Sequence, residues 1–169
     1  ERLNTFANRI YGAVGEVRSG FGAGGTKHRL ALGGDISWTR QQGLRDGTVP
    51  PRGETFPARA FPVTDFTLGG LFLADEIALG EGALTLFPAL RFDFYELDPK
   101  ADPLLPGFAA AGQSGSRLSP KLGLTLKAGG ALVLFGHYAQ GFLAPTPSQV
   151  NNFFENLASG YTSIPNPDL

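Results

Sequence analysis

Apolar and polar residues alternate along several stretches of the chain with the period of two that is typical of a strand with one apolar face. The clearest stretches are 27–40, 83–96 and 119–127. Less regular strands are expected over 7–19, 66–79 and 131–143, where glycines interrupt both faces. In 83–96 one face is apolar, with Leu84, Leu86, Leu90, Phe92 and Phe94. The opposite face carries Thr85, Ala89, Arg91, Asp93 and Tyr95. The pattern predicts an all-β chain of about six strands.

The connections between these strands alternate between short and long. Gly80-Glu81-Gly82 and Ala128-Gly129-Gly130 are tight, glycine-rich links that are typical of hairpins. Long segments rich in proline and polar residues follow the other strands, at 41–65, 97–117 and 144–169. Soluble domains seldom contain several such connections, whereas outer-membrane β-barrels have short turns on one side and long loops on the other. The loop pattern therefore predicts antiparallel, up-and-down strands of a transmembrane β-barrel.

Aromatic residues near the strand ends that lead into the long loops fit the girdle of such a barrel. These residues are Trp38, Phe92, Phe94, Tyr95, Tyr138 and Phe142. Six strands are too few to close a barrel, because the smallest ones need about eight. We therefore expect residues 1–169 to form a partial barrel segment with about six strands and three long loops.

Composition and charge narrow the function. The 24 Gly and 13 Pro disfavour a helical architecture, and 14 Lys and Arg against 15 Asp and Glu give no cationic surplus for nucleic acid. The absence of cysteine excludes disulfides and thiol chemistry. The glycines of 20–25 match the spacing of a dinucleotide fingerprint, but a strand follows where a helix is needed, so a turn is expected. We find no catalytic constellation and expect neither an enzyme nor an intrinsic cofactor or metal.

Two short motifs in the last third are more specific. The stretch Phe142-Leu143-Ala144-Pro145 is followed some twenty residues later by Asn166-Pro167-Asp168-Leu169. This pair resembles the two boxes that flank an extracellular loop in TonB-dependent outer-membrane receptors, particularly the haem and haemoglobin uptake group. Three earlier stretches are similar to strands of the same family and occur in the same order: 70–77 (GLFLADEI), 88–93 (PALRFD) and 118–124 (LSPKLGL). The resemblance covers most of residues 28–169.

The resemblance implies a 22-stranded barrel with an N-terminal plug, located in the outer membrane of a Gram-negative bacterium. Such receptors import an iron-bearing ligand with energy from the TonB complex. This chain would supply barrel wall, with the apolar face of 83–96 toward lipid and its polar face toward the lumen, while the plug, the TonB box and the remaining strands lie outside it. The implied partners are outer-membrane lipid, the TonB complex through the missing N-terminal region, and haem or a haem-carrier protein.

The ligand is the least determined part of this interpretation. Leu143 stands where the family's first box has Arg, and 146–165 contains no His, the residue that ligates iron in well-marked haem receptors. Haem as a transported ligand could be held by four residues that combine imidazole, phenol and phenyl side chains: Tyr161, His137, Phe153 and Phe154. The alternatives are a receptor of the same family for a ferric siderophore, a vitamin or a glycan, and a soluble β-sandwich that binds a partner through its loops.

Overall fold

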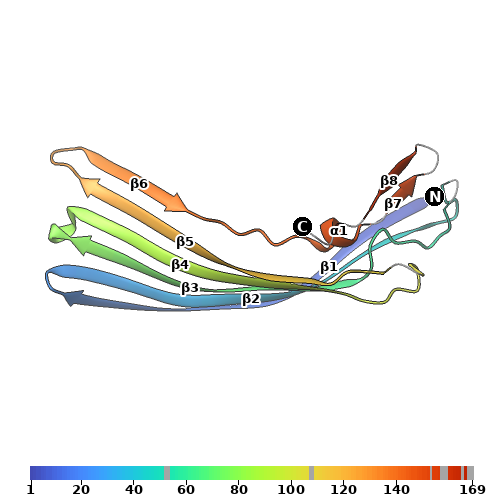
Figure 1. The fold of residues 1–169 in the computed structure, drawn as a ribbon, viewed down its shortest axis with the longest axis horizontal. Coiled ribbons are helices and arrows are strands. Elements are labelled where there is room, and N and C mark those ends of the chain that lie inside the picture. Colours follow the sequence, from blue (N-terminus) through green and yellow to red (C-terminus); the bar gives the residue numbers. More distant parts are fainter. Residues whose placement is uncertain (52–53, 107–108, 153, 157–159, 165, 167–169) are drawn as a thin grey trace.

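A computed structural model describes residues 1–51, 54–106, 109–152, 154–156, 160–164 and 166 (Figure 1). Its main element is a six-stranded sheet in which the strands follow one another in chain order. The strands are β1 (Arg2–Ala23), β2 (Thr26–Gly47), β3 (Thr64–Leu79), β4 (Leu84–Pro99), β5 (Gln113–Lys127) and β6 (Val133–Ala139). All five pairings are antiparallel. The predicted all-β, up-and-down architecture is therefore confirmed.

Small elements complete the fold. A 3-10 turn, η1 (Gly80–Gly82), joins β3 to β4, and a short helix, α1 (Pro147–Asn151), follows β6. Two short strands, β7 (Phe154–Asn156) and β8 (Tyr161–Ser163), form a separate antiparallel pair. Within the described ranges, no helix has the length and apolar character that crossing a membrane requires.

The short turns lie together at one end of the sheet and the long connections at the other (Figure 1). The first two strands are longer than the alternation indicates, because each has 22 residues where 7–19 and 27–40 were expected. About 9–11 residues suffice for a strand to cross a bilayer, so both extend well beyond one. Their outer parts continue the backbone ladder without a consistent apolar face, because Leu3 and Phe6 of β1 fall on opposite faces and 41–47 of β2 are mostly polar. No alternation is left to detect there. The expected turn at 20–25 is also smaller, because only Gly24 and Gly25 adopt positive φ there.

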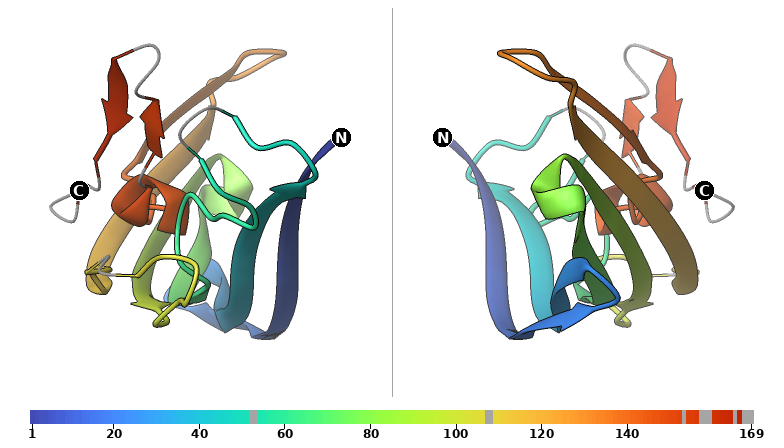
Figure 2. Two further views of the ribbon diagram at one scale, coloured as in Figure 1. Left: turned by 90° about the vertical axis from the view of Figure 1, so that its right-hand side faces the viewer. Right: turned by 90° about the vertical axis from the view of Figure 1, so that its left-hand side faces the viewer.

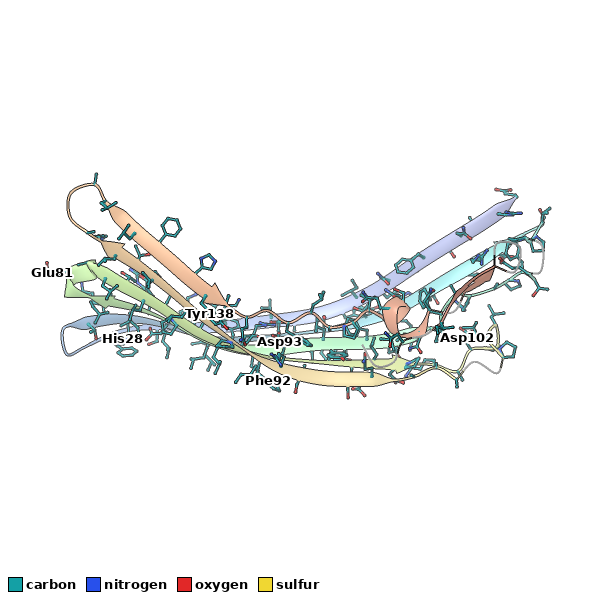
Figure 3. All side chains as sticks on the ribbon, turned by 45° about the horizontal axis from the view of Figure 1, so that its top comes forward. His28, Glu81, Phe92, Asp93, Asp102 and Tyr138 are labelled. Atoms are coloured by element: carbon teal, nitrogen blue, oxygen red, sulfur yellow. The ribbon has the colours of Figure 1, made fainter. Side chains whose placement is uncertain are left out.

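The two faces of the curved sheet differ in polarity. Helix α1 lies on the concave side (Figures 1 and 2). The convex side carries rows of apolar side chains, as in the register Leu32–Leu73–Leu90 across β2, β3 and β4. Many of them are exposed, from 38% for Leu126 to 72% for Val17. Neighbouring Phe92 and Asp93 on β4 consequently point to opposite faces (Figure 3).

The apolar band on the convex face ends at an aromatic pair. Tyr11 and Trp38 are direct cross-strand partners, and Arg40 and Asp65 form an ion pair two residues further toward the loops. At about 3.3 Å per residue and a tilt of about 45°, the stretch from His28 to Trp38 rises roughly 23 Å, close to the height of about 25 Å that barrel proteins present to lipid.

The predicted girdle is only partly correct. Trp38, Phe92, Phe94 and Tyr138 lie on the convex face, in the same registers as its leucines. Tyr95 and Phe142 were wrongly included. Tyr95 has the other parity on β4, and its ring packs at a centroid distance of 5.8 Å against that of Phe142 on the concave side.

The concave face carries a network of charged side chains. Arg91 of β4 extends over Gly70 of β3 to reach Asp35 of β2, with an Nη2 to Oδ1 distance of 2.8 Å, and its Nε lies 2.6 Å from Asp93. A side chain at Gly70 would block this path, because its Cβ would lie 2.7 Å from Cζ of Arg91. Because Gly70 has no side chain, an ion-pair network can cross β3 and join β2 to β4.

Candidate ligand-binding site

An apolar cluster covers the concave face near the long loops. Tyr95 and Leu97 of β4 are almost fully buried, and Val150 of α1 is completely buried. Phe66, Leu68, Phe142 and Ala144 pack against them. The first box motif is therefore folded against the inner face of the sheet. Its residues alternate, since Phe142 and Ala144 pack inward while Leu143 between them is 90% exposed.

Helix α1 is positioned by local hydrogen bonds and by one buried side chain. The backbone N–H of Thr146 donates to Oε1 of Gln149 at 2.8 Å, and Pro147 occupies the first turn, which are strong helix-start signals. Asn151 is fully buried. It accepts from the N–H of Ala111 at 2.9 Å and donates to the carbonyl of Ala111 at 2.8 Å. The helix is thereby fixed to the connection between β4 and β5.

The two long connections are also tied to each other. Arg59, between β2 and β3, forms an ion pair with Asp102, between β4 and β5, at 2.9 Å, and both side chains are largely buried. Nη1 of Arg59 also donates to the carbonyl of Gly43 at 2.6 Å. Asp102 lies at the loop end of the sheet (Figure 3). These contacts hold the loop end together as one assembly above the concave face.

Beyond the apolar band, Asp65 is held in its charged form. Nε and Nη2 of Arg40 donate to its two oxygens at 2.7 and 2.8 Å, and Nζ of Lys100 lies 3.3 Å away. These contacts, the hydrogen bond from Arg40 first, keep the pKa of Asp65 below its ordinary value against the opposing effect of partial burial. The pair is exposed enough that its contribution to stability is modest.

The structure places the first residue of the second box beside α1, next to the first box. The backbone N–H of Asn166, the first residue of the second box, donates to the carbonyl of Val150 in α1 at 3.0 Å. Phe142 and Ala144 of the first box pack against the apolar cluster that contains Val150. The rest of the second box, 167–169, falls outside the described residues. The first box and Asn166, some twenty residues apart in sequence, thus both contact the region of α1.

The predicted ligand residues are spread over two parts of the structure. His137 lies on β6 opposite Gly123, is exposed, and has the register of the concave face. Phe154 and Tyr161 are carried by the β7–β8 pair at the loop end, away from β6 (Figure 1). Phe153 falls outside the described residues, as do the side chains of Phe154 and Tyr161. Their role as ligands stays a prediction.

One polar group on the convex face was not anticipated. His28 donates or accepts through Nδ1 at 2.7 Å from Oδ2 of Asp75, while Nε2 lies 3.0 Å from Oγ1 of Thr26. The His28 ring stacks on Phe21 with centroids 4.8 Å apart. It lies at the short-turn end (Figure 3). His28 and Asp75 are far apart in sequence, so only the β2–β3 register reveals their contact.

These features define a class of protein. A curved antiparallel sheet with an apolar convex face, a charged concave face, short turns at one end and long loops at the other is the wall of a transmembrane β-barrel. Residues 2–169 match the family described as TonB dependent receptor-like, beta-barrel, and the chain belongs to this family. This is an outer-membrane class of receptors, as the sequence motifs had indicated.

A relative supports the same placement. A protein of Yersinia enterocolitica named Hemin receptor is 29% identical to this chain over 136 residues. The match covers 75% of this chain and 19% of the relative, so the chain spans about a fifth of that protein's length. Both the family and this relative are receptors by description.

Proposed function

We propose that this chain forms part of the wall of an outer-membrane receptor that imports haem. The convex face meets lipid, the concave face lines the lumen, the long loops lie outside the cell and the short turns face the periplasm. The observation that carries this orientation is the division of the sheet into an apolar convex face and a concave face with the Asp35–Arg91–Asp93 network. Membership of the receptor family supports the import activity.

Two observations support haem as the transported ligand. The relative from Yersinia enterocolitica is named a hemin receptor. The first box and Asn166 of the second box both contact the α1 region, and the chain between them carries the β7–β8 pair with Phe154 and Tyr161. A phenolate or an imidazole is a suitable axial ligand for haem iron. Tyr161 is therefore the first candidate ligand, and the exposed His137 on the concave face is the second.

The family resemblance implies the parts of the receptor that lie outside this chain. The complete barrel would have 22 strands, enclose a plug, and receive energy from the TonB complex through an N-terminal region. In this arrangement the chain forms part of the barrel wall and supports the long loops at its outer end. Its concave charges face the plug and the passing ligand.

A second cargo class is favoured by one feature of the first box. Leu143, which stands at the position of the Arg in the haem group's box, is an apolar side chain at 90% exposure. Together with the absence of His from 146–165, this favours a ferric siderophore, a vitamin or a glycan. Such a receptor would keep the same wall and change only the loop contacts.

An absorbance titration with haemin decides between these cargoes. The receptor is purified in detergent and titrated as the parent protein and as Tyr161→Phe and His137→Ala. Haem import predicts a saturable Soret shift in the parent that one of the two variants loses. Phe142→Leu serves as a control, because it alters the apolar cluster without removing an iron ligand. A parent protein that gives no saturable shift would retire haem and leave the second cargo class.

A further inference from the structure

The concave face is hollowed on the half of the sheet nearest the short turns. A cavity of about 680 Å3 opens there above β1 to β4. Its floor consists of three alanines that are successive cross-strand partners, Ala31, Ala74 and Ala89, and Phe72 and Phe87 border it. We call this cavity the alanine trough. It lies away from α1 and the box motifs, so the contacts of the long loops do not account for it (Figure 1).

The shape of the trough suits a flat ligand. The ring of Phe72 lies over Gly33 of β2, where a Cβ would be 2.6 Å from its Cζ. The side chain of Phe87 lies over Gly123 of β5, where a Cβ would be 3.3 Å from its own Cβ. Only methyl groups form the floor between the two phenyl rings, so the surface there is low and apolar. Its volume falls within the range of about 300–1,000 Å3 that is usual for sites of small ligands.

Lys121 of β5 continues the row of the floor and has no carboxylate beside it. It lies opposite Ala89 on one side and Ala139 on the other, so this chain supplies both of the neighbouring strands. The side chain is exposed and forms no hydrogen bond or ion pair with the residues that the structure describes. Glu76, the nearest carboxylate in the register of the sheet, already pairs with Arg29 at 3.3 Å.

The other charges around the trough cancel within the wall. Glu16 and Arg18 form an ion pair at its β1 end. On the loop side, the ion-pair network that joins β2 to β4 contains two carboxylates and one arginine, and Arg117 opposite Asp93 balances it. Lys121 therefore remains as a positive charge at the edge of an apolar floor.

This combination favours a small ligand over a docked protein surface. A typical protein interface makes about ten direct hydrogen bonds, whereas the trough leaves one charged group available. A ligand with a flat apolar body and a carboxylate at its edge needs no more than that. A porphyrin that carries carboxylates has this chemistry.

We propose that the alanine trough is a transit site for the carboxylate-bearing porphyrin that the receptor imports. The flat face of the porphyrin rests on the alanine floor between the two phenyl rings, and one carboxylate pairs with Lys121. The site requires no ligand to the iron, so it is distinct from the loop site of Tyr161. It lies on the periplasmic half of the lumen in the orientation proposed above, and it rests on the proposed import of haem.

The test separates surface binding from transport in cells whose only haemin receptor is the full protein. Haemin binding is measured without an energised TonB complex, and the rate of haemin uptake is measured with one. Lys121→Gln should lower the maximal uptake rate roughly tenfold through the loss of one charge-assisted contact, and Ala89→Leu should lower it by filling the trough. The concentration for half-maximal surface binding should stay unchanged, because the long loops are intact.

Lys27→Gln and Ala78→Leu are the matched controls. Lys27 and Ala78 are cross-strand partners on the concave face at the short-turn end, and neither lines the trough. Both variants should take up haemin at the parental rate. Haemin dimethyl ester has no free carboxylate, so the parent and Lys121→Gln should take it up equally.

Equal haemin uptake by the parent, Lys121→Gln and Ala89→Leu would overturn the proposal, and so would an equal slowing of the ester by Lys121→Gln. A joint loss of surface binding and melting temperature in the two variants would also overturn it, because the trough would then be a seat for the plug. A parent that neither binds nor imports haemin would instead refute the proposed function, which keeps the two failures distinguishable.

Discussion

Replacing Leu90 with arginine tests the assignment of the convex face to lipid. Leu90 lies on β4 between Leu73 and Pro120 and is 42% exposed. If this face met water, an arginine there would be tolerated, because its long side chain could extend into solvent. If it meets hydrocarbon, the same guanidinium must be desolvated or must reach the interface.

The depth of Leu90 sets the expected cost. From Leu84 near the short turn, the strand rises roughly 14 Å to Leu90, at about 3.3 Å per residue and a tilt of about 45°. This places Leu90 near the middle of a band about 25 Å tall. An arginine at that depth costs about 2–4 kcal/mol in a membrane barrel, which is roughly a thirtyfold to several-hundredfold loss in the ratio of folded to unfolded receptor.

The assay is equilibrium unfolding of the full receptor by guanidinium chloride in lipid vesicles. Ala74→Arg is the matched control, because Ala74 lies at the neighbouring level of β3 but lines a concave-face cavity of about 680 Å3. The denaturant midpoint should fall for Leu90→Arg and change little for Ala74→Arg. An unchanged midpoint for Leu90→Arg, or an equal loss for both variants, would refute the orientation of the sheet.

Three further outcomes are expected. Gly70→Ala should lower the unfolding free energy by about 1 kcal/mol, since its Cβ displaces Arg91 from its ion pair; the cost should vanish in an Arg91→Gln background on the same unfolding curves. Asn151→Ala should cost about 2 kcal/mol by leaving the partly buried backbone N–H and carbonyl of Ala111 without their partner, and faster proteolysis near α1 would reveal it. Because the pKa of Asp65 is lower in the folded state, its ionised carboxylate stabilises the fold at pH values above its ordinary pKa of 3.8. This stabilisation is lost as the pH falls below that value. The melting temperatures of the parent and Asp65→Asn should therefore differ at pH 7 and converge in acid.

The fold could be predicted where one face is apolar and the other polar. Between Leu84 and Phe94 the alternation directly reports the two faces of β4, and the structure confirms them. The outer half of β2 gave no such signal, because Gln41 and Gln42, which point to opposite faces, are both polar. The weak phase of β3 has a different cause, since glycines there leave room for side chains of neighbouring strands.

The site was less accessible to sequence reasoning. The box motifs identified the segments that meet at α1, but not that Phe142 packs inward beside Tyr95. The contacts that assemble the loop end join residues far apart in the chain, as with Asn151 and Ala111 or Arg59 and Asp102. Neither pair has a characteristic spacing, because each depends on how two loops of irregular length cross.

The glycines of the strands also constrain how this wall can vary. Phe94 lies over Gly69, where a Cβ would approach its ring to 2.5 Å, and Phe72 lies over Gly33, where the approach would be 2.6 Å. Each ring therefore fills the space that a side chain at the glycine of the neighbouring strand would need. Substitutions in such a pair are coupled: enlarging the glycine requires a smaller partner, and shrinking the ring leaves a void. Natural sequence drift and engineered libraries should thus change Gly69 and Phe94 together, as a single unit of two residues.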